Sequence, residues 1–99
     1  MKTRKNRELV LVFKTLGDIN RYRIFRSLIE KKHMVVSNIA KTLSISMPLS
    51  SQHLKILTLS GLVNKKKHGR SVYYFLNLDN WSVRSIIKVF PINKKVSNK

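Results

Sequence analysis

The hydrophobic pattern of this chain changes its period at Gly61, and this change limits the folds that the chain can adopt. Before Gly61 the apolar residues recur every three or four positions, as on one face of a helix, and after it they alternate, as in a strand. Two alternating runs, 62–67 and 70–77, flank His68-Gly69, where glycine can supply the positive φ of a two-residue turn. The sequence therefore predicts helices followed by a β-hairpin.

Capping residues divide the helical part of the sequence into separate elements. A potential N-cap precedes each helix after the first, and these caps are Asn20, Ser37, Ser46 and Asp79. Pro48 falls in the first turn of its helix, where a missing N–H costs nothing, and Pro91 ends the last helix. The expected elements are helices at 6–16, 21–30, 38–43, 47–60 and 80–90, a very short strand at 34–36, and the hairpin at 62–77.

The first helix has more apolar residues than one face can bury. A single inward stripe leaves Val10 and Leu11 without a partner, so we expect these two residues to contact another subunit. The inward residues would then be Leu9, Val12, Phe13 and Leu16. The last helix has a similar surplus, and its residues predicted to lie at the same contact are Trp81, Ile86, Ile87 and Phe90.

The charge of the chain is far from balanced, with 21 Lys and Arg against 4 Asp and Glu and a net charge of +17 on 99 residues. Such a charge favours a polyanionic partner, double-stranded nucleic acid first and an anionic membrane surface second. A chain of this length forms one domain. We therefore expect a basic arm at 1–5, a domain at 6–90 and a basic tail at 91–99.

Composition also excludes several classes of function. The chain has no cysteine, which removes disulfides, thiolate metal sites and cysteine nucleophiles. Four carboxylates make acid–base pairs scarce, and there is no Gly-rich phosphate loop, so neither an enzyme nor a bound metal or cofactor is expected. The apolar runs are too short for a signal peptide or a membrane span, which favours a soluble protein of the cytoplasm, without membrane contact.

Two short helices, a tight turn and then a basic hairpin follow one another in the order of a winged helix-turn-helix. The DNA major groove admits one helix, the preceding helix braces it, and a cationic hairpin, the wing, can reach nearby phosphates. The predicted fold is thus mainly α with a small β-hairpin (α+β), in the order α-α-β-α-α-β-β-α.

The helix at 47–60 is expected to be the recognition helix. Its core positions are Ser50, Leu54 and Leu57, so the opposite face is free to enter the groove. Gln52 on that face can form two hydrogen bonds with adenine, and Ser51 can give or accept one. Lys55 suits a phosphate, and apolar residues suit a thymine methyl. The predicted DNA-binding residues of this helix are Ser46, Met47, Pro48, Leu49, Ser51, Gln52 and Lys55.

The wing is expected to bind phosphate. A run of charge at a hairpin tip is often merely solvated, but here alternation places lysines on both faces of the ribbon, at the point where a wing meets DNA. Tyr73, Tyr74 and Phe75 point alternately to opposite faces, so we assign them to packing rather than to a stacking platform. The predicted DNA-binding residues of the wing are Lys65, Lys66, Lys67, His68 and Arg70.

Five runs of the sequence resemble those of the ArsR/SmtB type of winged helix-turn-helix repressor. They are 36–57 with 60–63, 69–76 in the wing, and 13–18 with 20–24 upstream. The resemblance covers about residues 8–90, with the motifs in the family's order. It implies a homodimer built by the first and last helices, binding of an imperfect inverted repeat, and repression that a signal relieves. It places the DNA-contacting positions on Met47, Pro48, Ser51 and Gln52 and between 65 and 70.

The resemblance fails where members of this family read their signal. The thiol-type metal sensors have a Cys-x-Cys pattern at the positions that are Val35 and Ser37 here, and neither residue can replace it. The other common metal site needs carboxylate and His ligands from the last helix, but no His follows Asp79. A regulator that responds to neither metal nor thiol oxidation is therefore expected. The alternatives are an architectural DNA-binding protein with little sequence preference and a module that binds another transcription factor.

Overall fold

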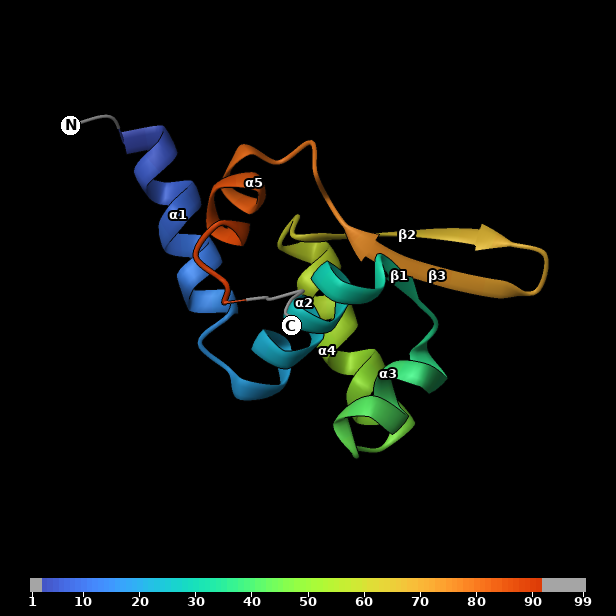
Figure 1. The fold of residues 1–99 in the computed structure, drawn as a ribbon. Helices are drawn as coiled ribbons and strands as arrows, with labels where there is room; N and C mark the ends of the chain where they lie inside the picture. Colours follow the sequence, from blue (N-terminus) through green and yellow to red (C-terminus); the bar gives the residue numbers. More distant parts are fainter. Residues whose placement is uncertain (1–2, 92–99) are drawn as a thin grey trace, which may run out of the picture.

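A computed structural model describes residues 3–91, and its elements follow the predicted order. They are α1 (Thr3–Thr15), α2 (Ile19–Lys31), β1 (His33–Met34), α3 (Val36–Leu43), α4 (Met47–Leu59), β2 (Val63–His68), β3 (Ser71–Leu76) and α5 (Trp81–Ile87). The strands form an antiparallel sheet in the order β1-β3-β2. Figure 1 shows α1 and α5 side by side at one end of the molecule and the β2–β3 wing extending from the other. The predicted winged helix-turn-helix fold is confirmed.

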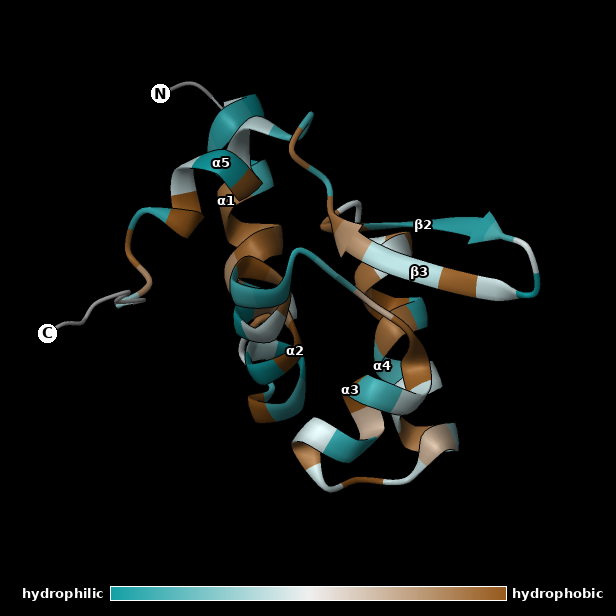
Figure 2. Cartoon of the chain, turned by 45° about the vertical axis from the view of Figure 1, so that its right-hand side comes forward, coloured by the Kyte–Doolittle hydropathy of each residue, from teal (hydrophilic) through white to brown (hydrophobic). Residues whose placement is uncertain are grey.

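The core lies where α2, α3 and α4 meet the root of the sheet. Phe25, Ile39 and Leu54 are fully buried there, and burial of each such side chain contributes about 1.5–3 kcal/mol. The wing has a different character: β2 is teal, hence hydrophilic, along most of its length in Figure 2, in contrast to the brown stretches of α1 and α4. Among the helices of residues 3–91, none has the length and apolar character that crossing a bilayer requires.

The observed N-caps differ from the predicted ones at three of four helices. Asp18 rather than Asn20 caps α2, because its Oδ1 accepts hydrogen bonds from the backbone N–H groups of Asn20 and Arg21. At α5 the cap is Asn80 and not Asp79; Asn80 Oδ1 accepts from the N–H of Ser82. At α2 and α5 the cap thus moves by two residues and by one residue to a neighbour with the same capping chemistry.

The two helices of the helix-turn-helix begin in different ways. Val35 precedes α3 in extended conformation and makes no side-chain cap, so the predicted cap Ser37 is wrong and lies within the helix. At α4 the prediction is confirmed: Ser46 Oγ accepts from the N–H of Leu49, and Pro48 sits in the first turn. Between the two helices, Ser44 takes the left-handed conformation (φ 58°) that makes the turn tight.

Both terminal helices have boundaries that the sequence did not predict. α1 begins at Thr3 rather than at residue 6, because Lys and Arg favour helix and Lys5 packs over the ring of Trp81, with Nζ 5.0 Å from the ring centroid. Residues 3–5 are therefore helix and not an arm. α5 ends at Ile87 rather than at Phe90, because Pro91 disfavours helical conformation in the residue before it. The N–H groups of residues 88–90 bond to carbonyls three rather than four positions earlier, which is a turn and not an α-helix. Of the predicted tail at 91–99, residues 92–99 lie outside the described residues.

The hairpin turn lies one residue later than predicted. His68 pairs with Ser71, so the two-residue turn is Gly69-Arg70 and not His68-Gly69. Gly69 has a φ of 64°, the positive value that a type II′ turn requires at its first central residue. The short strand before α3 is also shifted: it consists of His33 and Met34, which pair with β3, and ends before residues 35–36.

Replacement of Asn80 by alanine tests the corrected cap of α5. Asn80 also accepts from Ser82 Oγ, and its Nδ2 donates to the Gly61 carbonyl, so Asn80→Ala should lower the free energy of unfolding by about 1–2 kcal/mol. Asp79→Ala is the matched control and should change it by less than about 0.5 kcal/mol, because Asp79 is exposed. Urea unfolding of both variants measures the difference. A larger loss for Asp79→Ala would contradict the assignment.

Candidate DNA interface

Helix α4 is fixed in the core by one face. Ser50, Leu54 and Leu57 are fully buried, as predicted, and Ser50 Oγ donates to the Ser46 carbonyl (2.9 Å), which satisfies its buried hydroxyl. His53 is also buried on this face. Because residues advance by about 100° around a helix, burial of these positions turns the opposite ridge outward.

That ridge carries most of the residues predicted to bind DNA. Pro48, Ser51, Gln52 and Lys55 are exposed along successive turns of α4. At the N-terminal end Ser46 and Met47 are exposed, whereas Leu49 is half-buried and offers less surface to a ligand. The ridge continues to Leu59, an apolar residue that is 78% exposed and for which the sequence offered no role.

The predicted residues of the wing are all exposed, but they lie on two faces. The register pairs Lys65 with Tyr74 and Lys66 with Tyr73, and neighbouring residues of a strand point to opposite faces. Lys66 and His68 share their face with His33, Tyr73 and Phe75, which together line a shallow hollow of about 360 Å³. Lys65 lies on the other face, next to α4.

The charge around α4 and the wing has a single sign. No Asp or Glu occurs between residues 31 and 78, since the four carboxylates are Glu8, Asp18, Glu30 and Asp79. The same stretch contains eight cations, namely Lys31, Lys32, Lys41, Lys55, Lys65, Lys66, Lys67 and Arg70. A surface of this kind attracts phosphate over a distance set by the Debye length, about 8 Å at physiological salt.

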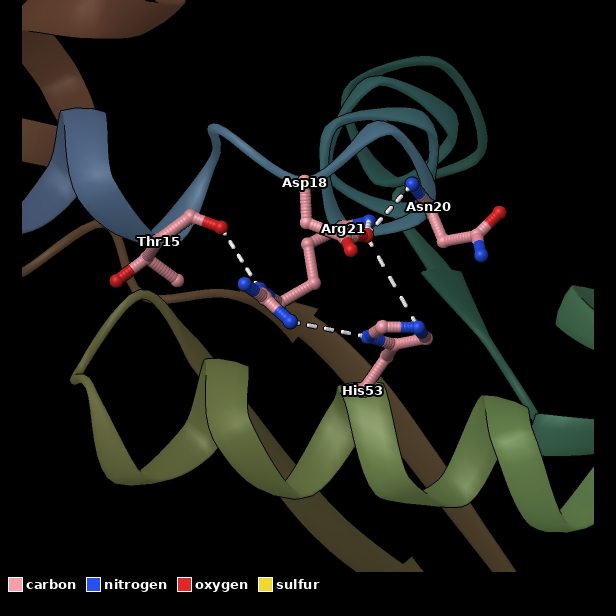
Figure 3. A network of polar contacts seen from close by, with 5 residues as sticks. All are labelled: Thr15, Asp18, Asn20, Arg21 and His53. Atoms are coloured by element: carbon pink, nitrogen blue, oxygen red, sulfur yellow. Dashed lines mark hydrogen bonds and ion pairs between the residues drawn. The ribbon is translucent and has the colours of Figure 1, made fainter.

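A polar network joins the inner face of α4 to the junction between α1 and α2 (Figure 3). Arg21 Nε donates to the Thr15 carbonyl (2.7 Å), and its Nη1 donates to His53 Nδ1 (3.1 Å). A guanidinium can only donate, so Nδ1 is the acceptor and the ring proton is on Nε2, which lies 3.9 Å from Asp18 Oδ1. The end of α1 also contacts the end of α4, because Thr15 Oγ1 donates to Ser60 Oγ (3.4 Å). Helix α4 is thus positioned by polar contacts as well as by the core.

The carboxyl of Asp18 is held in its ionised form by this network. Burial opposes ionisation, but hydrogen bonds from the backbone N–H groups of Arg21 and Asn20, together with the electrostatic attraction of the His53 ring and of the Arg21 guanidinium, outweigh it and lower the pKa of Asp18 from its usual value. Because the folded-state pKa is the lower one, the stabilisation by this carboxylate is complete above the unfolded pKa and disappears as the pH falls through the folded pKa.

The residues predicted to form a subunit contact differ in how much of their surface is exposed. Val10 and Leu11 are 54% and 45% exposed on α1, as expected, but Phe13 is 59% exposed and the prediction that it faces the core is wrong. Ile86 is 8% exposed and packs in the core of its own protomer, so its predicted interface role is wrong as well. Helix α5 is shorter than its hydrophobic pattern predicted, and Ile86 on it packs into the core.

The other predicted interface residues of the C-terminal region also have partners within the chain. Trp81 Nε1 donates to Glu8 Oε1 on α1. The Phe90 ring packs against Tyr22 and Phe25, with centroids 5.3 and 5.4 Å apart, and Ile87 borders the core. Their free apolar surface is therefore smaller than that of α1.

The metal-sensing positions of the resembled family hold no ligand set here. Val35 precedes α3 and Ser37 lies in its first turn. Within residues 3–91 no three His, Asp or Glu side chains come together as metal ligands would.

Sequence reasoning missed several residues that shape this surface. It assigned Tyr74 to packing alone and gave Thr58 and Arg21 no role, although Tyr74 and Thr58 line a hollow beside α4 and Arg21 anchors His53. The alternation of the wing could have placed Tyr74 opposite Lys65, but this requires the position of the turn. The link from Arg21 to His53 spans 32 residues and leaves no local pattern in the sequence.

An exposed helix of a helix-turn-helix beside a cationic wing defines the class of DNA-binding winged helix-turn-helix proteins. A family model described as a helix-turn-helix domain matches residues 16–66. The cadmium resistance transcriptional regulatory protein CadC of Listeria innocua is 38% identical over 64 residues, which cover 65% of this chain and 54% of CadC. The chain thus spans about half the length of CadC. It belongs to the ArsR-type family of helix-turn-helix transcriptional regulators.

Two further similarities extend over most of the chain. The transcriptional repressor SdpR of Bacillus subtilis is 32% identical over 83 residues, covering 78% of this chain and 91% of SdpR. The structure of HlyU from Vibrio cholerae has a TM-score of 0.79 at 26% identity and covers 89% of this chain and 92% of HlyU. The matching proteins are regulators of transcription and not enzymes, in agreement with the prediction from composition.

Replacement of Arg21 by lysine tests the anchoring of α4. Lysine keeps the charge but cannot contact the Thr15 carbonyl and His53 at once, so Arg21→Lys should lower the free energy of unfolding by about 1–3 kcal/mol. Arg23→Lys is the control on the same helix, because the exposed Arg23 makes a single 3.3 Å bond to the Leu43 carbonyl, and its effect should stay below about 0.5 kcal/mol. Equal losses in urea unfolding would show that the network does not anchor α4.

Proposed function

We propose that this chain is a sequence-specific double-stranded DNA-binding regulator of transcription, a homodimeric repressor of an inverted-repeat operator. The observation that carries the proposal is the exposed ridge of α4 beside a cationic wing, in a stretch of 48 residues, 31–78, without a carboxylate. The repressor role is supported by the similarity to SdpR and by the family to which the chain belongs.

In this proposal α4 enters the major groove with Gln52 and Ser51 toward the base edges. A good bidentate contact adds roughly 1–3 kcal/mol of discrimination against the wrong base. Met47 and Pro48 lie at the end of the helix that goes deepest, while Lys55 and the wing residues meet phosphates. Affinity then depends mainly on phosphate neutralisation, with log K falling by about 0.9 per released counterion against log salt.

The apolar face of α1 supports the homodimer. Val10, Leu11 and Phe13 expose large apolar side chains on one helix, and Val89 after α5 is also exposed. A second copy of the chain would cover this surface and present two copies of α4 to the two halves of a symmetric site. Trp81, Ile87 and Phe90 remain proposed contributors through the surface they leave free.

The proposed regulator responds neither to a metal ion nor to thiol oxidation. Support comes from the absence of cysteine in the sequence and from Val35 and Ser37 at the family's thiol positions.

An architectural DNA-binding protein of the same fold is the second candidate. A net charge of +17 favours it, as do the apolar residues Met47 and Leu49 where polar readers are commoner. Such a protein would coat DNA continuously and show little preference between sequences.

Selection of bound sequences from random duplex DNA at about 150 mM salt, where phosphate attraction is partly screened, separates the two candidates. Specific repression requires a two-fold symmetric site, and Gln52→Ala should relax the preference at one base position of each half. Lys66→Ala is the control and should weaken binding to all sequences alike. If the best selected site is bound no more tightly than random duplex, the architectural function is the correct one.

Replacement of Leu11 by aspartate tests the dimer. A charge in the centre of the α1 surface should shift the mass in solution from twice 11.6 kDa to 11.6 kDa, because a buried unpaired carboxylate costs several kcal/mol. Leu59→Asp places the same charge on an exposed leucine outside that surface and should leave the dimer intact. Light scattering measures the mass of both variants. If Leu59→Asp rather than Leu11→Asp dissociates the dimer, the subunit contact does not lie on α1.

A further inference from the structure

A hollow of about 410 Å³ separates helix α4 from the near face of the wing. The side of α4 that lines it consists of residues spaced by three or four positions, and the wing contributes one cross-strand pair, Lys65 and Tyr74. The lining residues are Ser51, Lys55, Thr58, Leu59, Lys65 and Tyr74. The hollow therefore lies between two elements that the proposed function brings to DNA.

The chemistry of the lining is that of an anion site. Lys55 and Lys65 place an ammonium on either side, and no carboxylate lies among the lining residues. Ser51 and Tyr74 each bring a hydroxyl that has no hydrogen-bond partner within residues 3–91, so both are free to donate. Thr58 is different, because its hydroxyl already donates to the Lys55 carbonyl (2.9 Å).

We infer that this hollow binds one phosphate of the DNA backbone, held by Lys55 and Lys65 and by the hydroxyls of Ser51 and Tyr74. The inference rests on the proposed function, since it assumes that α4 enters the major groove. The inference goes further than that function, because it states which wing lysine contacts the phosphate, Lys65, and assigns the Tyr74 hydroxyl to the same phosphate.

The position of the hollow favours a backbone phosphate over a base. Ser51 lies beside Gln52 on α4, and the phosphates of a strand border the groove into which Gln52 would reach. Binding of a phosphate there would fix the depth and rotation of α4 in the groove, whereas Gln52 would supply the sequence preference. Leu59 lies at the rim, where deoxyribose carbons adjoin the phosphate, which accounts for an apolar side chain so exposed.

The two cross-strand pairs of the wing provide a matched experiment. Lys65–Tyr74 and Lys66–Tyr73 are adjacent pairs of identical composition on opposite faces of the ribbon. Tyr74→Phe, which keeps the ring, should weaken binding of duplex DNA severalfold, because a hydrogen bond to a charged phosphate is lost. Tyr73→Phe should change it by less than twofold. Fluorescence anisotropy at several salt concentrations measures both.

Double mutants show whether Lys65 and Tyr74 act on the same phosphate. In a Lys65→Ala background Tyr74→Phe should cost clearly less than it does alone, whereas in a Lys66→Ala background it should keep its full cost. Lys65→Ala should also lower the salt slope by about 0.9. Equal effects of the two tyrosine changes, or additivity of Lys65→Ala with Tyr74→Phe, would overturn the inference.

Modified DNA can identify the phosphate that the hollow binds. A single uncharged methylphosphonate, moved along each strand of the duplex, should weaken binding of the unmodified protein at one position per half-site, and Lys65→Ala should remove that sensitivity. Loss of the sensitivity in Lys66→Ala instead would overturn the inference.

The tests separate this inference from the proposed function. If the protein binds all sequences equally, sequence-specific repression fails, but the contrast between the two lysine–tyrosine pairs still decides the phosphate site on any duplex. If a symmetric site is selected and the pairs nevertheless behave alike, the phosphate site fails while the proposed function stands. If no duplex is bound at any salt concentration, both fail.

Discussion

Burial of the inner face of α4 is the constraint on which the rest of the interface depends. Leu54 and Leu57 lose all contact with solvent, and Ser50 can join them because its hydroxyl is satisfied by the Ser46 carbonyl. Rotation of the helix would expose these groups and bury Gln52 or Lys55 without partners, which costs several kcal/mol. The face of α4 that stays exposed is therefore set by the core.

The same helix determines the direction of the wing. Gly61 has a φ of 79°, and the Leu62 N–H bonds to the Leu57 carbonyl, which closes the end of α4 and reverses the chain. Leu62 and Val63 then enter the core, so the root of β2 has little freedom. Figure 1 shows the result, a ribbon whose root is fixed and whose cationic tip extends away from the body.

The sequence predicted the parts of the fold that depend on periodicity and left open those that depend on a choice between neighbours. The buried positions of α4 repeat every three or four residues, so they and the exposed ridge could be predicted. Asp18 and Asn20, or Asp79 and Asn80, can each cap a helix, and the observed cap depends on how the chain arrives from the preceding element. Periodicity also does not determine whether a residue such as Ile86 is covered by its own chain or by a partner.

The position of one turn decides the chemistry of the hollow beside α4. A turn at His68-Gly69 would pair Lys67 with Arg70 and therefore Lys65 with Val72, so each residue of β2 would lie opposite a residue two positions earlier on β3. The observed turn at Gly69-Arg70 pairs Lys65 with Tyr74, and both lie on the face toward α4. Leu76 and Val63 lie on this face too, and both are buried, so slippage of the register would expose them. Burial of Val63 and Leu76 at the root of the ribbon thus places Lys65, two residues along the same face, beside α4.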